Sequence, residues 1–234
     1  RTSSRTSVVE SAINMSREIS NLAFGIERLR MEADTDIDHG INDINAALKK
    51  LEVINESITH ADAFGSPKAT LFDQRDQQIA IISEYMDIRT YQLENGATHL
   101  YVGAGIPLLD ESLHQLSYNK ANNLEIFVSN EELNPIEIYE VRPNGEFMEQ
   151  PFTLVSGGKS SEVTKIFNAG KMAGLLKLRD ETFPGMLEQL DMLASTFRDA
   201  FNELHNKGTG FPPASELTGT REVIASDRMK WEGN

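Results

Sequence analysis

Apolar residues recur at alternating steps of four and three through the first part of the chain, the heptad pattern of a long amphipathic helix. The positions are Val8, Ala12, Met15, Ile19, Leu22, Ile26, Leu29 and Ala33, then Ile37, Ile41, Ile44, Leu48 and Leu51. One extra step of four joins the two series, as in a stutter that locally unwinds a supercoil. The pattern predicts one long helix, or two helices hinged at Asp34–Gly40, that stops near Phe64-Gly65-Ser66-Pro67. We expect these stripes to pack within the chain.

A further helix is predicted from Pro67 to Asp87, with Ser66 as its N-cap. From Ile88 the pattern changes to short alternating runs separated by turn signals, such as Asn95-Gly96. The predicted strands are IRTYQLE, THLYVG, SLHQLSYN, LEIFVS, IEIYEV and VTKIF. No helical pattern separates these runs, so the sheet should be antiparallel.

Helical spacing then returns near the end of the chain. The apolar positions are Phe183, Leu187, Leu190, Ala194, Phe197, Phe201 and Leu204. A helix with one apolar stripe needs a partner, and the first helices carry a matching stripe. We therefore predict an α+β fold, in which an antiparallel bundle of long helices from both chain ends carries an inserted antiparallel β domain. The expected divisions are 1–87, 88–169, 170–208 and 209–234, the last being a loop or the start of a further segment.

The stretch FNELHNKGTG, from Phe201 to Gly210, combines two glycines with a lysine and a histidine. A phosphate would be repelled there, because the C-terminal end of a helix exposes carbonyl groups. Lys207 complements that dipole, and Gly208 suits a left-handed cap. We interpret the stretch as a helix end, with Phe197, Phe201 and Leu204 as structural or interface residues.

Composition narrows the classes of function. The 234 residues carry a net charge of −14, which disfavours nucleic acid and anionic membrane surfaces as partners. No cysteine is present, which excludes thiol nucleophiles, disulfides and thiolate zinc sites. No apolar run is long enough to span a bilayer, and no signal peptide is visible. The chain does not begin with Met, so we expect a fragment of a longer protein.

The acidic run Asp34-Thr-Asp36-Ile-Asp38-His39-Gly40 resembles a calcium-binding loop. An EF-hand loop needs glycine at its sixth position and glutamate at its twelfth, and this run places neither there. Asp34, Asp36 and Asp38 are therefore candidate metal ligands, but a solvated helix hinge with N-capping aspartates explains them better.

Other catalytic patterns are incomplete. Gly103-Ala-Gly105 begins like a dinucleotide-binding loop, but strand rather than helix is expected after it, so we predict a β-turn and no cofactor. His99 and His114 could meet across neighbouring strands, although both could equally face solvent. A Ser-His-Asp hydrolase triad is not excluded, but no GxSxG motif supports one.

The cluster Asp73-Gln74-Arg75-Asp76 lies on the predicted helix from Pro67. Paired carboxylates beside an arginine could perform acid–base chemistry. The same residues could instead tie helices or a loop together, because Arg75 has five donors to share between Asp73 and Asp76. We favour this structural role.

Four stretches, in this order, resemble the family of flagellar hook-associated protein 1 (FlgK), the hook–filament junction proteins. They are ADTDIDHGINDINAALKKLEVINESI with its repeated Ile-Asn pairs, ATLFDQRDQQIAIISEYMDI, GKMAGLLKLRDETFPGMLEQLD with its Arg-Asp pair, and FNELHNKGTGF. The resemblance covers most of the chain, and DQRD and FNELH carry most of its weight.

The resemblance implies a structural protein of the bacterial flagellum, exported by the flagellar type III machinery and extracellular at the hook–filament junction. It implies no enzyme, cofactor or metal. The implied partners are ring neighbours of the same protein, the hook protein, the second hook-associated junction protein and an export chaperone. Family members have terminal coiled-coil segments, which we expect to be missing here. Another flagellar axial protein, such as the second junction protein or a flagellin-like subunit, and a calcium- or ligand-binding module remain alternatives.

Overall fold

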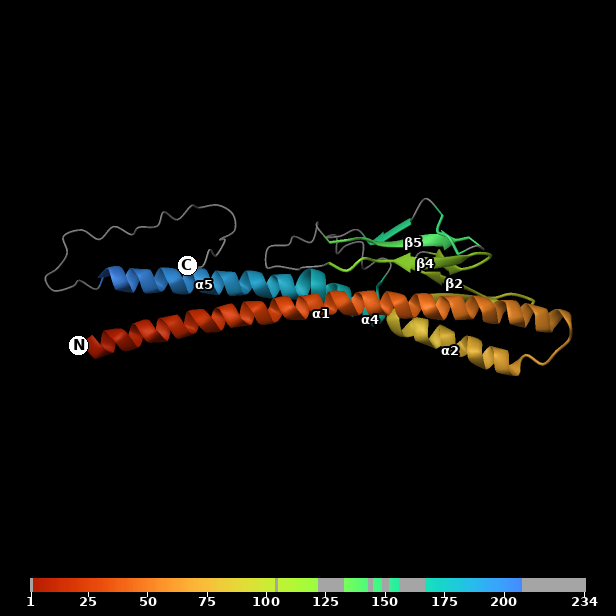
Figure 1. Cartoon of the computed structure of the whole chain (residues 1–234), viewed down its shortest axis with the longest axis horizontal. Helices are drawn as coiled ribbons and strands as arrows, with labels where there is room; N and C mark the ends of the chain where they lie inside the picture. Colours follow the sequence, from red (N-terminus) through yellow and green to blue (C-terminus); the bar gives the residue numbers. More distant parts are fainter. Residues whose placement is uncertain are drawn as a thin grey trace. The chain divides into compact units, whose positions relative to one another are not determined.

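The computed structural model describes residues 2–103, 105–121, 133–142, 145–148, 152–155 and 167–207. The helices are α1 (Thr2–Ala63), α2 (Ala69–Tyr85), α4 (Gly170–Lys177), the π-helix η2 (Leu178–Thr182) and α5 (Phe183–Lys207). The strands are β1 (Ile88–Gln92), β2 (Thr98–Val102), β3 (Ile106–Leu109), β4 (Leu113–Ser117), β5 (Ile136–Val141) and β6 (Phe152–Val155). Long helices and an antiparallel sheet confirm the predicted α+β fold (Figure 1).

The strands of the described residues form one sheet in the sequence order β1 to β6, with each neighbouring pair antiparallel. Hairpins connect the first strands: Gly96 has a φ of 87° in the β1–β2 turn, and Gly105 has a φ of 106° in the β2–β3 turn. The N–H of Gly105 bonds to the carbonyl of Val102 at 3.2 Å, a bond typical of the predicted β-turn, although residue 104 lies outside the described residues. The sequence patterns missed β3 and β6, and the strands predicted from LEIFVS and for most of VTKIF lie outside the described residues.

Of the two alternatives for the first helix, one long helix is confirmed and the hinge at Asp34–Gly40 is wrong, because α1 continues through it without interruption. The N-cap prediction is also wrong: Lys68 precedes α2 and makes no side-chain capping bond. Among the described residues, no helix is long and apolar enough to cross a membrane.

The chain divides into two compact units, and both divisions fall inside or beside a helix. The first unit contains Arg1–Ile26 and the chain from Gly185 onward, and the second contains Glu27–Pro184. The domain boundaries expected at residues 87 and 169 remain a prediction.

In the first unit, the start of α1 and α5 run in opposite directions (Figure 1). The predicted stripe on α5 is largely buried or half-buried, but the stripe on α1 is displaced by one residue at alternate positions. Met15 and Leu22 are exposed, whereas Ser16 and Ala23 are half-buried. The expectation that the apolar stripes pack within the chain is thus met for only part of this unit.

The second unit holds the hydrophobic core. It combines one face of α1, Ile82 and Met86 at the end of α2, the sheet, and one face of α4. The α1 residues Ile37, Ile41, Ile44, Leu48 and Leu51 are all buried, as the second apolar series predicts. Figure 1 shows the sheet and α2 on opposite sides of α1, so this helix forms the middle of the unit.

Candidate functional site

Two asparagines of α1 bind the sheet through paired hydrogen bonds. The side-chain amide of Asn45 accepts from the backbone N–H of Leu116 at 2.9 Å and donates to its carbonyl at 2.8 Å. Asn55 bonds Thr98 in the same way, at 3.0 and 2.8 Å. In this way each asparagine satisfies both the N–H and the C=O of one strand residue.

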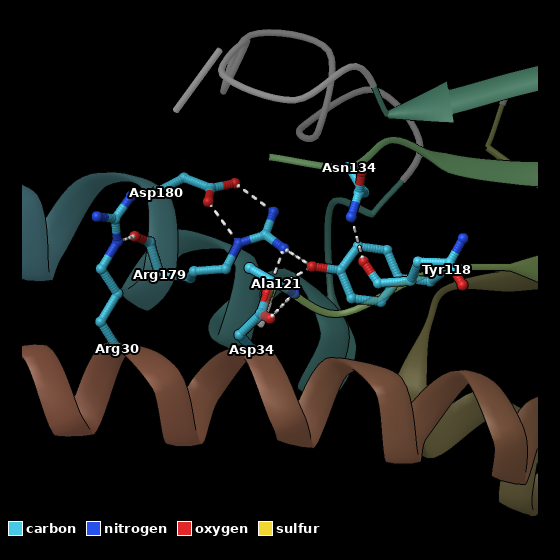
Figure 2. Close-up of polar contacts among 8 residues, drawn as sticks. Arg30, Asp34, Tyr118, Ala121, Asn134, Arg179 and Asp180 are labelled. Atoms are coloured by element: carbon cyan, nitrogen blue, oxygen red, sulfur yellow. Dashed lines mark hydrogen bonds and ion pairs between the residues drawn. The ribbon is translucent and has the colours of Figure 1, made fainter. Parts of the chain in front are cut away.

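A buried ionic cluster lies where α1 passes the end of β4 and the π-helix η2 (Figure 2). Its centre is Arg179, whose Nε and Nη2 donate to the two carboxylate oxygens of Asp180 at 2.6 and 3.0 Å. Nη1 of Arg179 donates to Asp34 at 2.9 Å and to the hydroxyl of Tyr118. The side chains of Arg179 and Asp34 are 1% and 2% exposed. We call Arg30, Asp34, Tyr118, Arg179 and Asp180 the clamp.

Backbone groups complete the contacts of Asp34. The Tyr118 hydroxyl donates to one carboxylate oxygen of Asp34, and the backbone N–H of Ala121 donates to the other at 2.8 Å. A carboxylate that accepts from a guanidinium, a hydroxyl and a backbone N–H is well satisfied despite its burial. Asp34 therefore joins α1 to the segment after β4 and to η2.

Arg30 binds the irregular backbone of the π-helix η2. The N–H of Phe183 bonds to the carbonyl of Leu178, five residues back. The next bond in that register would run from Pro184 to Arg179, but proline has no N–H. The free carbonyl of Arg179 instead accepts from Nε of Arg30 at 3.0 Å. The sequence Arg179–Pro184 thus creates the backbone acceptor that this arginine needs.

The clamp is balanced in charge, with two arginines and two aspartates. Burial lowers the pKa of Arg30. Burial also opposes the charge of Arg179, but its hydrogen bonds to Asp180 and Asp34 outweigh that effect, and its pKa is raised. Burial likewise raises the pKa of Tyr118, helped by the bond to Asp34, although the charge of Arg179 opposes this. The raised pKa values keep Arg179 charged and Tyr118 neutral at neutral pH, which suits a structural contact rather than proton transfer.

The candidate metal ligands do not converge. Asp34 belongs to the clamp, Asp36 is exposed and Asp38 is half-buried, and all three lie on continuous helix. The run does not adopt the conformation of a calcium loop or a hinge, since a continuous helix presents no ring of ligands. The described residues contain no group of three or more His, Asp or Glu side chains that could hold a metal ion.

The cluster on α2 is smaller than expected. Arg75 pairs with Asp76 at 2.8 Å and lies over the ring of Phe72, 4.8 Å from its centroid. Asp73 is exposed, and the described residues give it no contact with Arg75. The structural role proposed for this cluster remains a prediction.

On α5, the rings of Phe197 and Phe201 are half-buried and their centroids are 6.3 Å apart. Leu204 is 72% exposed. The helix is described as far as Lys207, so the cap predicted at Gly208 lies outside the described residues. The role of these three residues as an interface remains a prediction.

The comparisons with known proteins decide the family. A sequence model described as "Flagellar hook-associated protein FlgK helical domain" matches residues 1–216. The chain belongs to this family. Flagellar hook-associated protein 1 of Bacillus subtilis (strain 168) is 22% identical over 216 residues, which cover 88% of this chain and 41% of that protein. Its Salmonella typhimurium counterpart is 24% identical over 174 residues, 74% of this chain and 28% of that protein. The chain therefore spans less than half the length of these relatives.

The geometry gives the motifs of this FlgK helical domain a physical meaning. The Ile-Asn pairs supply Asn45 and Asn55, which bind the strands, and the Arg-Asp pair supplies the clamp. Gly170 is the first residue of the stretch that contains this Arg-Asp pair, and its φ is 81°. A Cβ added at Gly170 would lie 2.5 Å from the carbonyl oxygen of Tyr85. The family resemblance was the one sequence signal that pointed to Arg179 and Asp180. No local pattern points to Arg30 or Tyr118, because their partners lie far along the chain.

Proposed function

We propose that this chain is a structural part of the bacterial flagellum and acts at the junction between hook and filament. The match of residues 1–216 to the FlgK helical domain carries this proposal. The family is structural, and we propose no catalytic activity. The buried clamp and the paired asparagine bonds fit a structural role, because they hold α1 to η2 and to the sheet.

We further propose that the first compact unit packs against neighbouring chains. Large apolar side chains remain exposed there: Val8, Val9, Ile13, Met15, Leu22 and Phe24 on α1, and Met186, Met192, Leu193 and Leu204 on α5. Exposed apolar positions on this scale are typical of surfaces that become buried in an assembly. The proposed partners are ring neighbours of the same protein, the hook protein and the second hook-associated junction protein, with an export chaperone acting before assembly.

A deletion strain tests the proposed function. Without the gene, cells should make hooks but release filament protein into the medium, and electron microscopy should show bare hooks. The intact gene should restore attached filaments. Normal attached filaments in the deletion strain would refute the proposal, and immunogold labelling along whole filaments would favour a flagellin-like role instead.

The clamp gives this experiment a second arm. Complementation with Arg179→Leu should restore fewer filaments than complementation with Lys171→Leu. Lys171 is the control, because its ion pair with Glu84, at 2.5 Å, also lies in the second unit but is exposed. Equal restoration by both variants would show that the clamp does not matter to assembly.

A further inference from the structure

A polar groove lies on the sheet of the second compact unit, away from the clamp. Its volume is about 310 Å³. Its lining includes His99, Tyr101, Asp110, Glu111, His114 and Glu140. These residues come from β2, the turn between β3 and β4, β4 itself and β5, so four neighbouring parts of the sheet contribute to one depression.

Strand register brings the groups together. His114 lies directly opposite Glu140 in the β4–β5 pair, and opposite residues of an antiparallel pair share a face. Asp110 precedes β4 in the turn, and its carboxylate accepts from the backbone N–H of Ser112 at 3.0 Å. That bond fixes one carboxylate of the groove and leaves its other lone pairs available.

One buried atom of the groove lacks a partner. The Nδ1 atom of His114 is buried and makes no hydrogen bond, although the side chain as a whole is 15% exposed. The nearest carboxylate oxygen, on Asp110, is 3.9 Å away, which is too far for a hydrogen bond. A buried polar atom without a partner carries a free-energy cost that a bound group could remove.

The lining is rich in acceptors and negative in charge. Asp110, Glu111 and Glu140 supply three carboxylates, in a chain whose net charge is −14. Such a groove repels anions and favours a cation with several N–H donors and no acceptor. A metal ion fits less well, because the described residues contain no set of three His, Asp or Glu side chains that could hold one.

An aromatic ring adds a preference for a flat cation. The ring of Tyr101 contacts the rings of Tyr91 and His99. The centroid of Tyr101 lies 5.5 Å from that of Tyr91, with an angle of 81° between the planes, and 6.4 Å from that of His99, with an angle of 63°. These edge contacts restrain the tyrosine ring, and a guanidinium group stacks well on such a ring. The chain's own Arg89 lies opposite Tyr101 in the register, but it is exposed and does not line the groove.

We propose that this groove binds a guanidinium group, presented by an arginine side chain of another protein chain. The carboxylates of Asp110, Glu111 and Glu140 take its N–H donors, and Tyr101 supplies a surface for its plane. The proposal does not depend on the function proposed above, because it concerns only the chemistry of the sheet.

Nuclear magnetic resonance of the histidine rings tests this directly. N-acetyl-arginine amide should shift the signals of His99 and His114 in a saturable way. N-acetyl-citrulline amide, which has nearly the same shape without the charge, should not. Glu140→Gln and Glu111→Gln should each weaken binding at least threefold, whereas Asp73→Asn, which removes an exposed carboxylate on α2, should leave it unchanged.

Several outcomes would overturn the proposal. Absent or non-saturable shifts, equal shifts with the citrulline compound, or undiminished binding by both glutamate variants would each do so. Zn²⁺ that saturates the same histidine signals at lower concentration than the arginine compound would show a metal site instead.

Agmatine serves as a free small-molecule guanidinium. Tenfold tighter binding of agmatine than of an Ala-Arg-Ala peptide would contradict a protein as the source. Circular dichroism of each variant confirms that the fold is intact.

Discussion

Removing the arginine at the centre of the clamp should destabilise the second compact unit strongly. In Arg179→Leu, Asp34 loses its guanidinium partner and Asp180 loses both of its bonds to that group. Both carboxylates are almost completely buried, so water cannot replace the lost donors. Breaking a buried ion pair by removing one partner costs about 3–5 kcal/mol, a large share of the roughly 5–15 kcal/mol that stabilises a typical domain.

The assay is urea denaturation followed by circular dichroism at 222 nm, with the free energy of unfolding compared between variants. Arg198→Leu is the matched control. Its ion pair with Asp199 has a similar geometry but is exposed, so its loss should cost about 0–1 kcal/mol. The double variant Asp34→Leu/Arg179→Leu should recover part of the loss, because it leaves fewer charges buried without partners. A cost for Arg179→Leu below about 1 kcal/mol, or equal to that of Arg198→Leu, would refute the reasoning.

Three further predictions concern the joints around α1 and α2. Asn45→Ala should lower the free energy of unfolding by about 2–4 kcal/mol in the same assay, because it leaves an N–H and a C=O of β4 without partners. The control is Asn42→Ala, an exposed position where the free energy of unfolding should change little. Equal losses in the two variants would contradict this explanation. Gly170→Ala should lower the melting temperature by several degrees, because the added methyl group would collide with the backbone of Tyr85 at a positive φ; an unchanged melting temperature would show that the backbone can shift. The hydrogen bond to Asp43, with smaller effects of burial and charge, raises the pKa of Tyr85 from 10.0 to about 12. A raised folded-state pKa gives stability that is present below pH 10 and lost as pH rises towards 12, so Tyr85→Phe should flatten the decline in stability over that window.

The sequence predicted the core side of α1 well where burial is complete. Ile37, Ile44 and Leu48 are apolar and completely buried, so periodicity alone finds them. Apolar periodicity failed in the first unit, where Ser16 and Ala23 are half-buried while Met15 and Leu22 are exposed. A search for apolar residues selects the larger side chains, but small residues occupy part of the less exposed face here.

The clamp could not be found by spacing. Arg30 and Asp34 bond to groups 149 and 145 residues away, and nothing local distinguishes them from surface charges. The aspartates near Asp34 instead resemble a calcium-binding loop, and this resemblance led to the incorrect prediction of a hinge. Pro184 is a partial signal, since a proline inside a helix leaves one carbonyl without its helical partner, but the donor that replaces that partner is fixed only by the tertiary fold.

The positions of Arg30, Asp34, Asn45 and Asn55 set a constraint on how the length of this protein can change. Arg30 and Asp34 both bond to Arg179, whereas Asn45 bonds to Leu116 and Asn55 to Thr98, all from a single uninterrupted helix. Inserting or deleting one residue between them would turn the far contacts by about 100° around the axis and shift them by about 1.5 Å. Length variation among relatives should therefore be excluded from residues 30–55. Before residue 26, changes of whole heptads would return every side chain to nearly its original direction, so natural variation in the length of α1 should appear there in multiples of seven.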